Sequence, residues 1–156
     1  MATIPLRISV GSVGLRYSFT AVEAITGGQL VEWRALSTNP GVRACGVAAV
    51  DSLLVAGVAL HDIRATAASI QDTAVVGKEH GLTVVAYGIV PVTFTAAATR
   101  GQLLVPTASG HVTPIAAVTT PTAADVTSTR SVIGFCAQDS VGAGAVGLAF
   151  IKPSGG

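Results

Sequence analysis

The amino-acid sequence predicts an all-β fold, a small β-barrel or sandwich built from two similar half-repeats, with short helical excursions. Most apolar runs are about four to eight residues long and rich in Val, Leu and Ile, which is typical of strands. The 18 glycines and 7 prolines interrupt these runs at short intervals, as turns between strands require. A pattern from the first half of the chain also recurs in the second half, so one supersecondary unit is used twice.

The N-terminal segment, residues 1–19, is predicted to be a strand or arm that precedes a single β-rich domain at residues 20–156. Apolar and polar side chains alternate from Leu6 to Val10 and again over residues 13–19, which is the period of a strand. Gly11-Ser12 fits the turn of a hairpin, but an extended arm would show the same alternation. The hairpin and the arm both stay open.

A short helix is predicted at residues 21–26. Thr20 and Glu23 have the spacing of a capping box, in which two side chains bind the first free amide groups of a helix. Gly27 and Gly28 then supply a stop signal, which limits the helix to about one and a half turns.

The rest of the domain is predicted to be strands with two interruptions. Residues 63–77 have the apolar spacing of a helix, and residues 119–130 are a Thr-, Ala- and Pro-rich segment that predicts a loop. The predicted strands are short and rich in β-branched residues. They are Gln29–Trp33, Gly46–Val50, Leu53–Leu60, Leu82–Tyr87, Ile89–Phe94, Gln102–Val105, His111–Ile115, Val132–Ala137 and Ala145–Ile151.

The internal repeat covers about residues 24–94 and 97–151. Gly28-Gln29-Leu30 recurs 73 residues later as Gly101-Gln102-Leu103, and Val55-Ala56-Gly57 recurs 77 residues later as Val132-Ile133-Gly134. Each half therefore has a turn that ends in Gly-Gln-Leu, a variable excursion, a strand with the pattern Val-x-Gly, and a further apolar strand. One such unit cannot enclose a core by itself, so the two halves are predicted to share one barrel or sandwich.

The composition argues against several partners. Charged residues make up only 11% of the chain and the net charge is +1, so the basic surface that nucleic acid requires is lacking. The longest apolar stretch, residues 44–60, is too short for a membrane span and contains Asp51. Pro5 and Arg7 stand where a signal peptide would have its apolar stretch. These observations predict a protein made in the cytoplasm that binds neither nucleic acid nor a membrane.

The reactive side chains predict no catalytic, metal or cofactor site, and the chain is therefore expected not to be an enzyme. Asp62 and Asp139 follow equivalent strands, where aspartate commonly caps a turn. The three histidines, at positions 61, 80 and 111, lack the spacing of zinc ligands. Cys45 and Cys136 lie in apolar segments and are expected to be buried free thiols.

Several short motifs follow one another in an order that resembles a known family of proteins. They are Val55–Asp62 (VAGVALHD), Gly88–Thr93 (GIVPVT), Arg100–Val105 (RGQLLV), Ser109–Pro114 (SGHVTP) and Val132–Phe135 (VIGF). This succession resembles small capsid decoration (cement, or head-stabilising) proteins of tailed bacteriophages, over roughly residues 24–151. The excursions at residues 63–77 and 119–129 depart from the shortest members of that family.

The resemblance implies a structural virion protein without cofactor or metal. Such a protein binds the outer surface of an icosahedral shell of major capsid protein, often as a homotrimer at threefold or quasi-threefold positions, and stabilises the shell. It implies a location on the capsid exterior. The alternative is a β-rich module that binds a ligand or glycan on a virion or cell surface, although such sites usually need aromatic platforms and aromatic residues are 4% of the chain.

Five residues are candidates for a capsid or subunit interface: Ile4, Leu6, Arg7, Ile8 and Trp33. The apolar residues among the first four alternate along the N-terminal segment, which suits the addition of a strand to the edge of a capsid sheet. Trp33 is the only tryptophan, and it is expected either to pack in the core or to anchor an interface.

Overall fold

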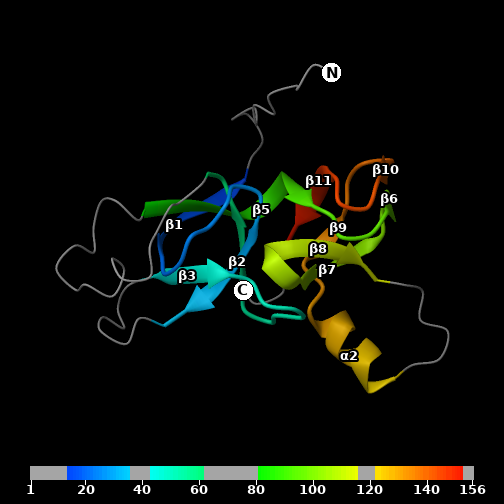
Figure 1. Cartoon of the computed structure of the whole chain (residues 1–156), viewed down its shortest axis with the longest axis horizontal. Coiled ribbons are helices and arrows are strands. Elements are labelled where there is room, and N and C mark those ends of the chain that lie inside the picture. Colours follow the sequence, from blue (N-terminus) through cyan, green and yellow to red (C-terminus); the bar gives the residue numbers. More distant parts are fainter. Residues whose placement is uncertain (1–13, 36–42, 62–80, 116–121, 153–156) are drawn as a thin grey trace, which may run out of the picture.

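The computed structural model describes residues 14–35, 43–61, 81–115 and 122–152. Strands dominate these residues, which confirms the predicted all-β fold (Figure 1). The strands are β1 (Leu15–Ala21), β2 (Leu30–Arg34), β3 (Ala44–Val47), β4 (Val55–Ala59), β5 (Gly81–Thr93), β6 (Ala98–Thr99), β7 (Leu103–Thr107), β8 (His111–Pro114), β9 (Gly134–Cys136), β10 (Ser140–Val141) and β11 (Val146–Ile151). The helices are the 3-10 helix η1 (Ala108–Gly110) and the α-helix α2 (Ala123–Arg130).

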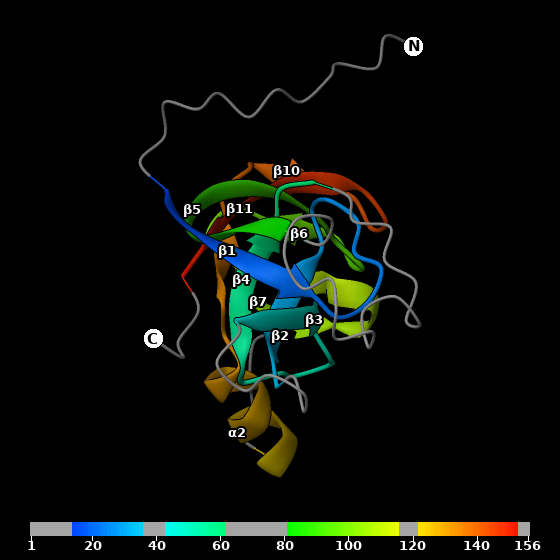
Figure 2. The same cartoon turned by 90° about the vertical axis from the view of Figure 1, so that its left-hand side faces the viewer.

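Five strands close into a first barrel in the order β1, β3, β2, β4 and β5, because β5 also pairs with β1 (Figure 2). Strand β1 is antiparallel to β5, with Tyr17 opposite Val84, and parallel to β3, with Ala21 opposite Cys45. The other neighbouring strands of this barrel are antiparallel. The alternating apolar residues that begin at Leu15 therefore form a barrel strand.

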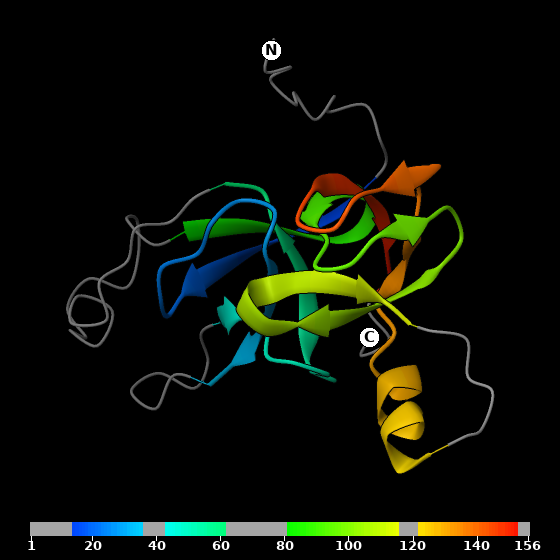
Figure 3. The same cartoon turned by 45° about the vertical axis from the view of Figure 1, so that its right-hand side comes forward.

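A second barrel lies beside the first and consists of β5, β11, β9, β7 and β8 (Figure 3). A parallel bridge between Phe94, directly after β5, and Val112 of β8 completes the ring. Strands β6 and β10 form a separate two-stranded ribbon. The 13-residue strand β5 belongs to both barrels, since its first half pairs with β1 and β4 and its second half pairs with β11.

The two barrels repeat the same pairings in the same register. In the first barrel Val31 lies opposite Gly57, and in the second Leu104, which is 73 residues later, lies opposite Gly134. The parallel contact of Ala21 with Cys45 likewise corresponds to the bridge from Phe94 to Val112. Each half of the repeat thus forms a five-stranded ring of its own, with β5 as the common strand, so the prediction that the two halves share one barrel is wrong.

The repeated Gly-Gln-Leu motif forms the same turn in both halves. The Thr26 backbone N–H donates to Gln29 Oε1 at 2.7 Å, and the Thr99 N–H donates to Gln102 Oε1 at 2.7 Å. The intervening glycine has a φ of +87° at Gly28 and of +86° at position 101, a left-handed conformation that favours glycine. Each glutamine side chain thus holds the turn that begins the next barrel strand.

The core contains two clusters of buried side chains, and the barrels fill their interiors differently. At two equivalent positions the first barrel has Ala21 and Leu82, both fully buried. The second barrel has Phe94 and Gly147 there, and a Cβ atom on Gly147 would lie 3.1 Å from Phe94 Cε2. Each barrel therefore combines one large and one small residue at these two positions. The large residue is at the second position in the first barrel (Leu82) and at the first position in the second barrel (Phe94).

The structure corrects two of the predicted non-strand segments. Residues 21–26 are not helical, because Thr20 and Ala21 continue β1 and the Glu23 carboxylate accepts a hydrogen bond from the Val47 backbone N–H at 2.7 Å. Within residues 119–130, which were expected to be a loop, α2 forms instead. Its N-terminus carries a reciprocal cap between Thr122 and Asp125.

Strand boundaries also differ from the prediction in places. The segments on either side of Gly88 are one continuous strand, β5, and the predicted strand at residues 46–50 lies at Ala44–Val47. The predicted helix at residues 63–77 lies outside the described residues. So do all of residues 1–13, where the choice between an arm and a hairpin stays a prediction.

Candidate interface surfaces

Trp33 lies on the surface of the first barrel, near the end of β2. Its side chain is 42% exposed, and its ring contacts Phe19 edge-on, with ring centroids 4.7 Å apart. One edge of the indole therefore packs on the barrel interior while the rest is open to a partner. This combination of a fixed apolar ring and an exposed surface is typical of an interface anchor.

The other four interface candidates, Ile4, Leu6, Arg7 and Ile8, lie outside the described residues. The described chain begins at Gly14 and enters β1 at Leu15, which is 51% exposed. The role of the N-terminal segment therefore stays a prediction.

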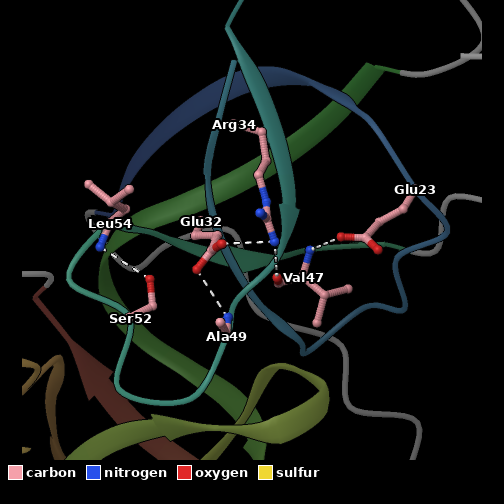
Figure 4. A network of polar contacts seen from close by, with 7 residues as sticks. All are labelled: Glu23, Glu32, Arg34, Val47, Ala49, Ser52 and Leu54. Carbon is pink, nitrogen blue, oxygen red and sulfur yellow. Dashed lines mark hydrogen bonds and ion pairs between the residues drawn. The ribbon is translucent and has the colours of Figure 1, made fainter. Parts of the chain in front are cut away.

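Glu32 and Arg34, the sequence neighbours of Trp33, belong to a polar network in the first barrel (Figure 4). The Glu32 side chain is only 8% exposed, and its Oε1 pairs with an Arg34 guanidinium nitrogen at 2.8 Å. Its other oxygen, Oε2, accepts a hydrogen bond from the Ala49 backbone N–H at 3.0 Å. Each carboxylate oxygen thus has a partner, so Glu32 links the chain after β3 to strand β2.

The two cysteines are buried free thiols, as predicted. Burial, with a smaller contribution from the nearby Glu23 carboxylate, raises the pKa of the Cys45 thiol from 9.0 to about 12. The thiolate is the nucleophilic form of cysteine, so this environment suppresses the reactivity of Cys45. A packing role fits both residues.

The remaining polar candidates are dispersed. Asp139 forms an exposed ion pair with Arg100 at 2.8 Å, and His61 contacts the Gly81 carbonyl oxygen at 3.2 Å through Nε2. Asp62 and His80 lie outside the described residues. Within the described ranges, no three His, Cys, Asp or Glu side chains gather as metal ligands, and no helix is long and apolar enough to cross a membrane.

A shallow hollow of about 270 Å³ lies where β4, β5 and β11 approach one another. Glycine and aliphatic residues make up most of its lining, and the other lining residues are His61, Pro91 and Thr93. The lining contains no Phe, Tyr or Trp ring on which a sugar could stack, so the hollow gives no specific support to the glycan-binding alternative.

The sequence did not single out an apolar surface on the second barrel. Four residues on adjacent strands form this surface, which we call the outer ladder: Leu103, Phe135, Phe150 and Ile89. The Phe135 and Phe150 rings stack with centroids 5.0 Å apart. Leu103 and Ile89 are each 49% exposed and Phe135 is 38% exposed. In the sequence, only their alternation with core residues along each strand indicates that they face outward.

The strands define the class of this protein: an all-β chain of two five-stranded barrels that share one strand. Among solved structures, the crystal structure of head fiber gp8.5 N base in bacteriophage phi29 has a similar fold. The TM-score is 0.60 at 13% sequence identity, and the match covers 90% of this chain and 95% of that chain. At this identity the likeness shows the fold alone. No protein-family model and no curated protein sequence matches the chain.

Proposed function

We propose that the chain is a structural protein of a bacteriophage virion, which binds the outer surface of an icosahedral capsid and stabilises the shell. The observation that carries this proposal is the fold similarity to the head fiber gp8.5 N base, which extends over 90% of this chain. The motif succession that resembles capsid decoration proteins supports the same assignment from the sequence. In this proposal the protein acts by binding alone and needs no catalytic residue, cofactor or metal.

The partner in this proposal is the major capsid protein, and the protein itself binds as a homo-oligomer, with a trimer favoured. Two features support apolar interfaces. Charged residues are only 11% of the chain, and large apolar side chains such as Trp33 and Phe135 are exposed on the barrels. Binding that depends on apolar contacts is expected to tolerate salt, because salt screens charges and leaves apolar burial intact.

Co-sedimentation of the purified chain with expanded shells of the cognate major capsid protein, at low and high salt, tests the proposal. Saturable binding at both salt concentrations is expected. If the chain binds at neither salt concentration, the capsid assignment is overturned. Glycan-array binding by the same protein would then favour the ligand-binding alternative.

Two variants test the proposed contact residues in the same assay. Deletion of residues 2–10, which removes Ile4, Leu6, Arg7 and Ile8, is expected to lower occupancy of the shell, and so is Trp33→Ala. Val126→Ala, which changes an exposed residue of α2, is the matched control and should bind like the wild type. Unchanged occupancy after the deletion would remove the N-terminal segment from the proposed interface.

A further inference from the structure

The two barrels of one chain contact each other asymmetrically. The first barrel has its own version of the outer ladder, in which Leu30 lies opposite Val58 and Val58 lies opposite Val85. These three side chains are between 0% and 4% exposed. They pack in the same core cluster as Ile133 and Ile151 of the second barrel. The first barrel therefore buries this face against the second barrel.

The equivalent face of the second barrel has no such cover within the described chain. Leu103 corresponds to Leu30, and Phe135 corresponds to Val58, but both are exposed, at 49% and 38%. A two-fold relation between the barrels would bury both faces equally. The contact is instead head-to-tail, and it leaves one copy of the same face open.

Polar contacts border the buried face of the first barrel. The Gln29 amide donates through Nε2 to the Ser109 carbonyl oxygen at 2.9 Å. The Asp51 backbone N–H donates to the Pro106 carbonyl oxygen at 3.1 Å, and its carboxylate accepts from the Ser131 hydroxyl at 3.3 Å. Residues around Pro106 and Ser131 are thus the part of the second barrel that receives the first.

The counterparts of these contact residues are exposed. Gln102, the equivalent of Gln29, uses Oε1 in its own turn, and its Nε2 has no acceptor among the described residues. In the first barrel, the equivalent of Pro106 is Trp33, which is 42% exposed. The equivalent of Ser131 is Leu54, which is 60% exposed. The chain therefore presents both halves of a second head-to-tail contact, one on each barrel.

We propose that the outer ladder of one copy docks on the Trp33 and Leu54 surface of a second copy of this chain, in the arrangement that joins the two barrels within each chain. The inference rests on the proposed homo-oligomer and names its surfaces. Both surfaces are apolar, and they are the equivalents of the two sides of the contact between the barrels within one chain. The contact is heterologous because it joins two different patches. Repetition of such a contact gives a ring if the rotation closes.

Sedimentation velocity of the full chain tests this proposal without any capsid. The wild type is expected to form species larger than the 15.5-kDa monomer as its concentration rises. Phe135→Asp, in the outer ladder, and Leu54→Asp, in the receiving surface, are each expected to lose all of these larger species. Val126→Asp introduces the same charge at an exposed residue of α2, 57% exposed, and should leave assembly unchanged.

A mixture of the two defective variants is the decisive measurement. Leu54→Asp keeps an intact outer ladder and Phe135→Asp keeps an intact receiving surface, so the mixture is expected to form a 1:1 heterodimer. An isologous contact, in which each patch binds its own copy, would give no heterodimer. Leu103→Asp replaces Phe135→Asp if circular dichroism shows that the latter does not fold.

The outcomes separate this inference from the proposed function. If the wild type assembles and neither variant affects it, the named surfaces are wrong while the oligomer stands. If the wild type is monomeric at every concentration yet binds capsid shells, self-association through these surfaces is overturned and capsid binding is retained. If the variants assemble normally and fail only on shells, the outer ladder faces the capsid protein.

Discussion

Single residues maintain the close approach of strands in both barrels. Gly57 and Gly134 occupy equivalent positions, with φ of +149° and +156°. A Cβ atom at Gly57 would collide with the Val85 carbonyl oxygen, and one at Gly134 would collide with the Phe150 carbonyl oxygen. The glycine of the repeated Val-x-Gly pattern is therefore required by backbone contact with the next strand.

Gly57→Ala is expected to destabilise the protein by about 1–3 kcal/mol or more, because a strained φ and a backbone collision coincide. The free energy of unfolding in urea is the measurement. Gly142→Ala is the matched control, since a Cβ there meets no atom within 4 Å, and it should change stability by less than about 0.5 kcal/mol. Equal stability of the two variants would contradict this account of the repeat.

Glu32→Ala is expected to lower the free energy of unfolding by about 1–3 kcal/mol, because the largely buried Glu32 carboxylate is both the acceptor of the Ala49 N–H and the partner of Arg34. The control is Asp139→Ala, which removes the exposed partner of Arg100. It should lower the free energy of unfolding by at most about 1 kcal/mol, since both members of that pair are well exposed. A loss for Asp139→Ala that equals the loss for Glu32→Ala would argue against the burial-based explanation.

At the scale of elements, the helix cap shows what the sequence could and could not predict. Thr20 with Glu23 and Thr122 with Asp125 have the same spacing, but only the second pair caps a helix. Thr20 is held in β1 by pairing with β3 and β5, and tertiary pairing overrides the local signal there. Local patterns predicted most strands and the repeat, whereas they could not tell which capping signal would be used.

The cap of α2 is expected to weaken in acid. Hydrogen bonds from the Thr122 hydroxyl and backbone N–H hold the pKa of the Asp125 carboxyl below its ordinary value of 3.8. A lowered pKa in the folded state means that the cap stabilises α2 above the ordinary pKa and is lost as pH falls through the lower, folded-state pKa. Hydrogen-exchange protection of the α2 amides should therefore decrease several-fold in strong acid.

Two variants separate this cap from general acid unfolding. Asp125→Asn can still accept from the Thr122 N–H but does not titrate, so its α2 protection should lose this acid dependence. Asp125→Ala should lack the extra protection at every pH. The same acid loss in Asp125→Asn as in the wild type would show that another group is responsible.

The sequence was less informative about surfaces than about strands. The repeat predicted that Leu30 and Leu103 are equivalent, and the structure places both on the outside of their barrels. One is nonetheless buried and the other is 49% exposed, because only the first barrel is covered by its neighbour. Equivalent residues in a repeat can thus be distinguished only from the packing of the whole chain.

At the scale of the whole molecule, the shared strand β5 predicts that both barrels unfold together. Val31→Ala in the first barrel and the equivalent Leu104→Ala in the second should each destabilise the protein, the latter by about 2–5 kcal/mol. Trp33 is the only tryptophan and packs in the first barrel, so its fluorescence reports that barrel. In Leu104→Ala, the fluorescence midpoint should fall as far as the midpoint measured by circular dichroism.

The wild type provides the reference for this comparison, since both signals should give one midpoint if unfolding is two-state. A fluorescence midpoint that stays at the wild-type value in Leu104→Ala, while circular dichroism shows an earlier transition, would mean that the barrels unfold independently.

The continuity of β5 also bears on how such a chain can grow. No linker separates the two units, because the strand that completes the first ring runs directly through Gly88 into the strand that starts the second. Strand β11 is the counterpart of the first half of β5 and ends at Ile151. A third unit joined in frame at this point would extend β11 in the same way and would lie against the outer ladder. The architecture is therefore open to tandem gene fusion, in which a further unit of the same chain would cover the outer ladder in place of a second copy.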